Sequence, residues 1–186
     1  MENEADILQA IRQDDWMMET LEAACSMHQP DWWICAGFVR TKVWDGLHGY
    51  TNRTLLPDID FIYFDELYAE ERMEKEIEEQ LKRLLPDRPW SVKNQARMHM
   101  VNRIPPYTSA GDALSKFPET ASAIGVKLDE LGELLLAAPW GVYDLIRMKI
   151  QPTSFFAQSG ELMSIYERRI ERKKWKEKWP LVEINP

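Results

Sequence analysis

Cysteine is scarce in this sequence, and long apolar runs are absent. The only cysteines, Cys25 and Cys35, do not form the C-x-x-C spacing of redox and zinc sites. No stretch approaches the roughly 18 apolar residues of a membrane-spanning helix, so we expect no membrane partner. The opening residues MENEADILQAIRQDD are acidic and lack the apolar core of a targeting peptide. We therefore expect a cytoplasmic protein with reduced, buried thiols.

Several common catalytic signatures are also missing. The chain has no Walker-type glycine loop, no G-x-S-x-G elbow, no H-E-x-x-H motif and no dinucleotide fingerprint. Its three histidines, His28, His48 and His99, lack metal-ligand spacing. These absences argue against the P-loop, serine-hydrolase, zinc-protease and dinucleotide-binding classes.

The chain is acidic overall, with a net charge of −8 over 186 residues. That charge argues against general binding to DNA or RNA, so a nucleic-acid partner is not expected. The charge is uneven, because residues 167–178 hold seven Lys or Arg and three Glu. A basic helix can hold a phosphate backbone, but a solvated helix with alternating signs is commoner, and we favour that interpretation.

Hydrophobic periodicity divides the chain into helices and short strands within one domain, residues 1–186. The pattern predicts long helices over residues 4–27, 69–85 and about 158–178, and shorter ones over 38–48, 97–102, 109–116 and 140–149. Strands are predicted over residues 32–36, 58–65, 90–95, 125–128 and 134–137. This irregular alternation predicts an α+β (α/β-like) fold, a small mixed sheet flanked by helices.

Two acids at the start of the strand over 58–65 are the clearest candidates for chemistry. Side chains alternate faces along a strand, so Asp58 and Asp60 point the same way, about 7 Å apart. Such like charges repel unless a cation lies between them, and Mg²⁺ prefers hard oxygen ligands. Acid-x-acid pairs arise by chance about five times in a chain with 31 acids, and a solvated strand start is the alternative interpretation.

Longer runs of the sequence resemble a known family. WWICAGFVR followed by PDIDFIYFD is similar to the signature of the DNA polymerase beta nucleotidyltransferase superfamily, in which a helix-opening glycine follows one strand and Asp-x-Asp begins another. The runs AGFVRTKVWD, DIDFIYFD, WSVKNQARMH, YTSAGDALSKFPETASAIGV and APWGVYDL together resemble a bacterial nucleotidyltransferase-like family over about residues 30–150. The resemblance implies the nucleotidyltransferase fold.

The resemblance also implies a reaction, the magnesium-dependent transfer of a nucleotidyl group from ATP or another nucleoside triphosphate to an acceptor hydroxyl. Asp58 and Asp60 would be the catalytic metal ligands, holding two Mg²⁺ ions that clamp the attacking and leaving oxygens at the α-phosphate. Gly37 and Phe38 would open the helix whose amides face the triphosphate. The acceptor and the oligomeric state stay open.

Further nucleotide-binding candidates are basic or amide side chains. Arg40, Lys93 and Arg97 would neutralise triphosphate charge, with surface ion pairing as the alternative. Active members of the superfamily usually carry a third acid on a neighbouring strand, where this chain offers Asn94, a neutral oxygen ligand. A second departure is Phe38, which stands where another small residue is usual, and the spacing from Gly37 to Asp58 is also longer than usual.

The missing third acid leaves three alternatives. One of Asp45, Asp65 and Asp112 enters the site from elsewhere, or only one metal binds well. In the third alternative the protein is a catalytically inactive module that binds a nucleotide or a partner without turnover.

The other polar and aromatic residues near these motifs have plainer interpretations. His99 is expected to be a partly buried histidine rather than a general base. Aromatic packing is the default for Tyr107 and Trp44, with stacking on a base as the alternative. Glu119 and Thr120 are expected to begin a helix after a proline, and Asp144 to have a structural role.

Overall fold

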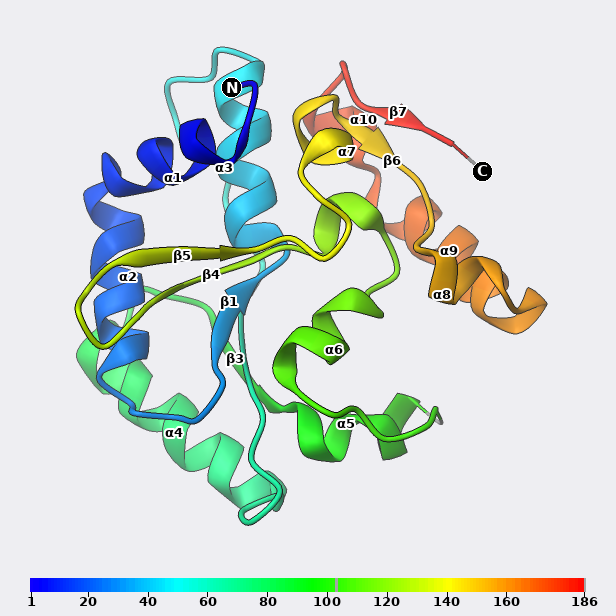
Figure 1. The fold of residues 1–186 in the computed structure, drawn as a ribbon. Coiled ribbons are helices and arrows are strands. Elements are labelled where there is room, and N and C mark those ends of the chain that lie inside the picture. Colours follow the sequence, from blue (N-terminus) through cyan, green and yellow to red (C-terminus); the bar gives the residue numbers. More distant parts are fainter. Residues whose placement is uncertain (103, 186) are drawn as a thin grey trace.

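A five-stranded mixed sheet organises the computed structural model, which describes residues 1–102 and 104–185 (Figure 1). The strand order is β3-β2-β1-β4-β5. The strands are β1 Trp33–Cys35, β2 Ile59–Tyr63, β3 Trp90–Asn94, β4 Gly125–Leu128 and β5 Leu134–Ala137. β2 and β3 pair parallel, and the other neighbours pair antiparallel. The predicted small mixed sheet of an α+β fold is confirmed.

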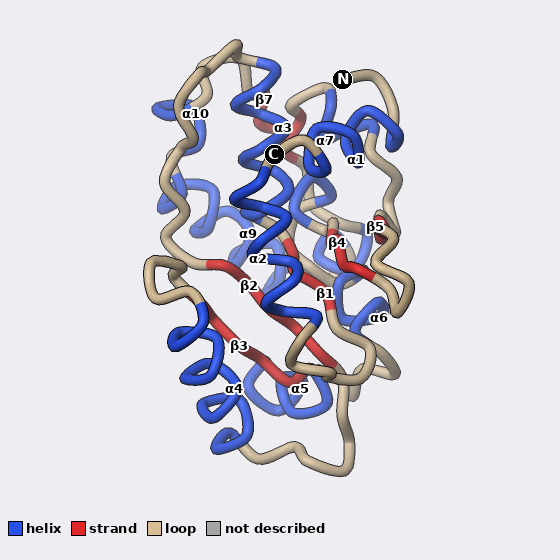
Figure 2. Tube along the Cα trace, turned by 90° about the vertical axis from the view of Figure 1, so that its left-hand side faces the viewer, coloured by secondary structure: helices blue, strands red, loops and turns tan. Residues whose placement is uncertain are grey.

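Helices lie on both sides of this sheet. On the left of Figure 1 are α1 Glu4–Arg12, α2 Asp15–Cys25 and α4 Glu71–Leu84, and on the right are α5 Gln95–Asn102 and α6 Ala110–Ser115. In Figure 2, which looks from that left side, α2 crosses in front of the strands and α4 lies beside β3. Helix α3, Gly37–Leu47, follows β1 directly.

The segment that follows β5 folds beside the end of the sheet where β2 begins. It contains α7 Tyr143–Ile146, β6 Lys149–Ile150, α8 Ser154–Ala157, α9 Gly160–Lys173, α10 Trp175–Lys178 and β7 Glu183–Ile184. β6 and β7 form a separate two-stranded parallel sheet. Within the described residues, no helix is long and apolar enough to cross a membrane.

The two faces of β2 explain where the site lies. Ile59, Phe61 and Tyr63 are buried in the larger hydrophobic core, which is covered by α1, α2 and α4. Ile62 belongs instead to a smaller cluster on the opposite face, with Cys35. Because strand side chains alternate, the acids at the start of β2 share the face of Ile62. That face opens to the C-terminal helices.

Three helix predictions are wrong in extent. The predicted helix over 4–27 is two helices, because Asp14 leaves the helical conformation and its carboxylate caps α2 by accepting from the Met17 amide. The predicted helix over 158–178 breaks at Lys174, whose φ of 47° is left-handed and separates α9 from α10. The helix predicted over 140–149 is the single turn α7.

The remaining predicted elements are confirmed with small shifts at their ends. The two strands over 125–128 and 134–137 have the predicted bounds, and the ambiguous segment 38–48 is α3. Ser109 caps α6 by accepting from the Asp112 amide, as its position predicted. Both cysteines are free; Cys35 is buried and Cys25 is half-buried.

Candidate active site

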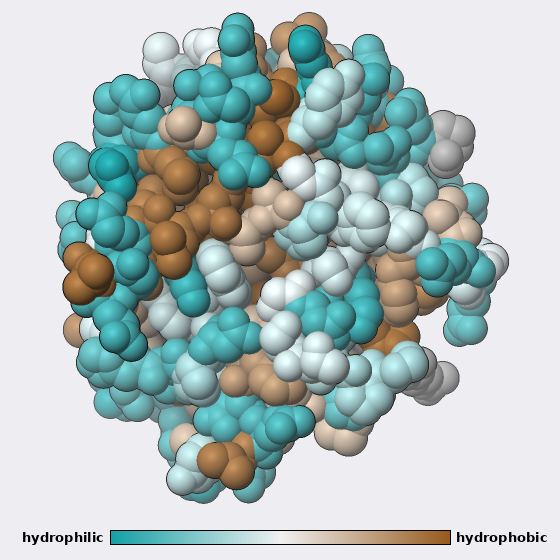
Figure 3. Space-filling model, viewed as in Figure 1, coloured by the Kyte–Doolittle hydropathy of each residue, from teal (hydrophilic) through white to brown (hydrophobic). Residues whose placement is uncertain are grey.

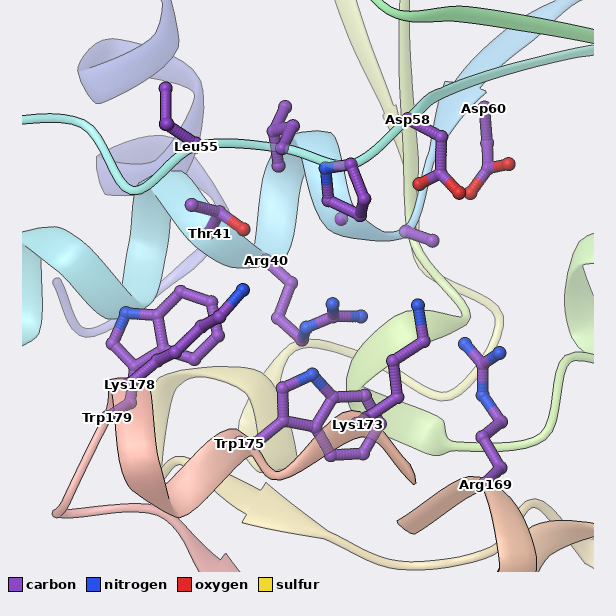
Figure 4. A pocket seen from close by; sticks show the side chains of 14 residues that line it. Arg40, Thr41, Leu55, Asp58, Asp60, Arg169, Lys173, Trp175, Lys178 and Trp179 are labelled. Atoms are coloured by element: carbon purple, nitrogen blue, oxygen red, sulfur yellow. The ribbon is translucent and has the colours of Figure 1, made fainter. Parts of the chain in front are cut away.

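Asp58 and Asp60 point into one cavity. Asp58 directly precedes β2 and Asp60 is the second residue of that strand, so their carboxylates lie side by side (Figure 4). Burial, and then the charge of Asp58, raise the pKa of Asp60 to about 6. Two acids crowded in this way need neutralisation by a cation, which is the arrangement that the strand pattern predicts.

The start of α3 faces the same cavity. Ala36 precedes the helix with a φ of 52°, a left-handed conformation that is strained for alanine, and no side chain caps this end of α3. Gly37 lines the cavity. The side chain of Phe38 is only 1% exposed and packs on Trp16, so it does not obstruct the helix start. Uncapped amides at a helix N-terminus favour an anion.

Arg40 forms the inner wall of this cavity. Its guanidinium lies 5.3 Å from the ring centroid of Trp44 and 4.9 Å from that of Trp175, and it donates to Ser122 Oγ at 2.6 Å. Burial lowers the pKa of Arg40 to about 10, so the side chain stays positively charged at neutral pH. Trp175 is one of two tryptophans on the cavity wall.

Two more cations reach the acids from α9. Arg169 and Lys173 line the cavity and extend toward the carboxylates (Figure 4). The interpretation of residues 167–178 as a solvated helix is therefore wrong for these two side chains and for Lys178 of α10, which also lines the cavity. The i,i+4 spacing of Arg169 and Lys173, which places both on one helix face, was the signal available in the sequence. Burial and the neighbouring Arg169 lower the pKa of Lys173, whereas the charge of Asp58 raises it.

A buried acid holds Arg169 in place. Glu119 is fully buried, and Arg169 Nε donates to its Oε1 at 2.5 Å. Glu119 precedes the short 3-10 helix Thr120–Ser122, so its position at a helix start is confirmed, but its ion pair with α9 was not predicted. The other carboxylate oxygen of Glu119 has no hydrogen-bond partner among the described residues.

The basic and amide candidates on β3 and α5 gather around Glu74 instead. This acid on α4 is fully buried and accepts from the backbone N–H of Asn94 at 3.0 Å and from Arg97 Nη2 at 2.9 Å. Lys93 pairs with it at 3.3 Å. The side chain of Asn94 binds the backbone around Asp65. Neither Asn94 nor Arg97 lines the cavity at Asp60.

None of the proposed substitutes for a third acid joins the pair. Asp45 accepts from Thr54 and from Trp179 Nε1, and Asp112 pairs with Lys116 at 2.8 Å. Asp65 caps the turn that follows β2. Across the part of the chain that the structure describes, no three acids, histidines or cysteines are grouped to hold a metal.

The plainer interpretations hold for most other candidates. Trp44 is fully buried and donates to the Leu145 carbonyl. Asp144 accepts from Thr120 Oγ1 at 2.7 Å, a structural contact. His99 is half-buried on α5 and does not line the cavity that contains Asp58 and Asp60.

The crowding of the two acids has a measurable consequence for stability. Because the pKa of Asp60 is raised in the folded state, its ionised form opposes folding at neutral pH, and that cost disappears as the pH falls toward 4. In EDTA at pH 8, Asp60→Asn is expected to raise the free energy of unfolding by about 1–3 kcal/mol, measured by urea denaturation. At pH 4.5 the gain should fall to about a third of its value at pH 8, because that pH lies below the folded pKa of Asp60 but still above the unfolded one.

Asp15→Asn, at an exposed acid on α2, is the matched control and should change stability by less than about 0.5 kcal/mol. An equal effect of Asp60→Asn at both pH values would show that the carboxylate is not strained by its surroundings.

Comparison with known proteins gives a consistent result. The sequence profile described as "Nucleotidyltransferase" matches residues 22–184. An NMR structure described as revealing a CCA-adding enzyme head domain is 32% identical, with a TM-score of 0.90, and the match covers 100% of this chain and 97% of that one. Comparison with curated proteins gives no match.

Two larger enzymes share the fold. The Thermotoga maritima CCA-adding enzyme complexed with tRNA is 18% identical, with a TM-score of 0.57. A CCA-adding enzyme in complex with CTP is 15% identical, with a TM-score of 0.60. All of this chain is covered in both matches, but only 43% and 44% of the other chains are, so the chain spans less than half of their length.

Proposed function

Because the chain belongs to the nucleotidyltransferase family, and is therefore a transferase, we propose that it transfers a nucleotidyl group from a nucleoside triphosphate to an acceptor hydroxyl with the help of Mg²⁺. One observation carries this proposal. Asp58 and Asp60 share a cavity with four basic side chains and with an uncapped helix start, so metal ligands and phosphate ligands meet in one place.

The acids fit a divalent cation. Their carboxylates lie side by side on one face, and burial together with the charge of Asp58 raises the pKa of Asp60, a cost of ionisation that a bound cation would relieve. Bound magnesium would bridge phosphate oxygens and stabilise the charge that develops at the α-phosphate. With only two acids present among the described residues, we propose that they hold one ion firmly and share any second ion with the triphosphate.

The basic side of the cavity would bind the triphosphate. The amides at the start of α3 offer donors to a phosphate, and Gly37 leaves space for its approach. Arg40 and Lys173 bring positive charge from opposite sides, as Figure 4 shows. Such a focus of positive charge is what an acidic protein needs in order to attract a polyanionic substrate.

The fold relatives support a nucleoside triphosphate as the donor. CCA-adding enzymes with this fold have been solved with CTP and with ATP. We propose ATP or another nucleoside triphosphate as the substrate of this chain. Another of these enzymes was solved with tRNA, whereas the acidity of this chain predicts an acceptor other than nucleic acid.

Binding and turnover can be tested separately. Isothermal titration should show that Mg²⁺ tightens ATP binding to the native protein and not to Asp58→Asn. Release of pyrophosphate from ATP, measured in the same buffers, reports turnover. Magnesium-independent binding that is unchanged in Asp58→Asn would favour the inactive module over the enzyme.

Lys173→Met is expected to raise the KM for the triphosphate about tenfold while kcat changes less than about threefold, because a contact with the phosphate tail binds ground state and transition state alike. Steady-state kinetics with ATP measure both constants. Lys176→Met removes an exposed lysine of α10 outside the cavity and should leave KM within about twofold. An unchanged KM in Lys173→Met would exclude α9 from the triphosphate site.

A further inference from the structure

A second and larger cavity meets the first one at Asp60. Its volume is about 940 Å³, close to the upper end of the range for small-molecule sites. Ala36, Asp60 and Arg169 line both cavities, so they are two halves of one cleft. The proposed triphosphate site accounts only for the smaller, basic half.

The walls of the larger half are mainly apolar. The sheet contributes Ile62, the segment after α6 contributes Phe117, and α8 and α9 contribute Phe155, Leu162 and Ile165. Figure 3, viewed as in Figure 1, shows apolar side chains in the indentation at the right, between α8 and the end of α5. Such a lining favours an aromatic or aliphatic body over a heavily hydrated one.

The basic side chains in this half already have partners. Lys93 pairs with Glu74 at 3.3 Å, and Lys116 pairs with Asp112 at 2.8 Å. Arg169, at the boundary with the basic half, is held by Glu119. A polyanion entering here would therefore have to displace existing ion pairs, whereas a molecule of low charge would not.

The direction of the reaction assigns a role to this half. In an in-line displacement the attacking oxygen arrives opposite the leaving group. If the leaving pyrophosphate lies in the basic half, the attacking hydroxyl must come from the other side of Asp60. That side is the apolar half.

Resting on the proposed function, we propose that the apolar half binds the acceptor, and that the acceptor is a small, weakly charged molecule with a hydroxyl group on an aromatic or aliphatic body. Its hydroxyl oxygen forms a bond to the α-phosphorus while the bond from that phosphorus to the bridging oxygen breaks. Pyrophosphate leaves with the electron pair of that bond, and the hydroxyl proton passes to solvent.

Binding can be tested without nucleotide or metal. In a protein labelled at isoleucine methyl groups, titration with 2-phenylethanol is expected to shift the signals of Ile62 and Ile165, which line the cavity, but not that of Ile7 in the core. Glycerol, a hydroxyl compound without an apolar body, should bind at least tenfold more weakly. A short single-stranded RNA should cause no such shifts.

Matched variants test the location. Ile165→Lys should weaken 2-phenylethanol binding at least tenfold, as read from the Ile62 methyl signal. Leu131→Lys, the same kind of substitution at an 87% exposed leucine near the β4–β5 turn, should leave it within about twofold. The proposal would be overturned if glycerol bound as tightly as 2-phenylethanol, or if RNA bound more tightly than 2-phenylethanol. It would also be overturned if Ile165→Lys kept the native affinity for 2-phenylethanol.

Transfer of a labelled nucleotidyl group tests whether the apolar half is the acceptor site. With α-labelled ATP and Mg²⁺, label should move to 2-phenylethanol at least ten times faster than to glycerol at the same concentration. A protein that releases pyrophosphate from ATP but shows no such preference would overturn the assignment. Loss of magnesium-dependent ATP binding and of pyrophosphate release would instead count against the proposed function, and the methyl titration, which needs neither, would still report on the cavity.

Discussion

Asp58→Asn and Asp60→Asn are each expected to lower nucleotidyl transfer at least about 1,000-fold. Asparagine keeps the size of the side chain but removes a negative charge from a site where the described residues supply two acids for a metal, so the loss should fall on kcat as well as on KM. The measurement is the rate of pyrophosphate release from ATP at saturating Mg²⁺.

Asp65→Asn is the matched control for this loss. Asp65 lies just beyond the far end of β2 and caps a turn by accepting from the Leu67 amide at 2.8 Å, a bond that asparagine can also accept. Its activity should stay within about threefold of the native rate. Activity that survives in Asp58→Asn, or is lost equally in Asp65→Asn, would contradict the assignment of the metal site.

The acid inside α4 is expected to matter for folding rather than for transfer. Glu74→Gln should lower the free energy of unfolding by about 1–3 kcal/mol, because it removes the buried counter-charge of Lys93 and Arg97, which are themselves only partly buried. Glu74 is fully buried, so glutamine would keep some of the hydrogen bonds in place while water reaches the two cations only in part. Urea denaturation of the purified protein measures the effect.

Glu76→Gln makes the same change on the same helix at a surface pair with Arg72, and should cost less than about 0.5 kcal/mol. Similar losses in the two variants would show that the cluster around Glu74 contributes little. A raised KM for ATP in a folded Arg97→Met protein would restore Arg97 to the nucleotide-binding residues.

The sequence reveals the two acids and the helix start of the site better than it reveals the cations that face them. Asp58 and Asp60 lie on one short strand, where alternation alone places them on one face. The start of α3 follows its strand directly, so Gly37 is also brought to the cavity by local order. These residues need no knowledge of distant contacts.

Arg169 and Lys173 reach the same acids only through the docking of a helix from the other end of the chain, which no local pattern encodes. Lys93 and Arg97 were better candidates by proximity in the sequence. A buried acid on α4 claims them instead, because charged side chains that lose water need a partner of opposite charge. The breaks at Asp14 and Lys174 were also missed, since helical periodicity continues across both.

The placement of Arg169 and Lys173 on α9 also bears on the order of events during synthesis. A growing chain that has emerged only as far as α6 carries both aspartates but neither of these cations. Until α9 has been made and has docked, the acids lack two of the three positive charges that face them in the finished protein. Competence for catalysis would therefore come only after α9 has been synthesised and has docked beside the sheet.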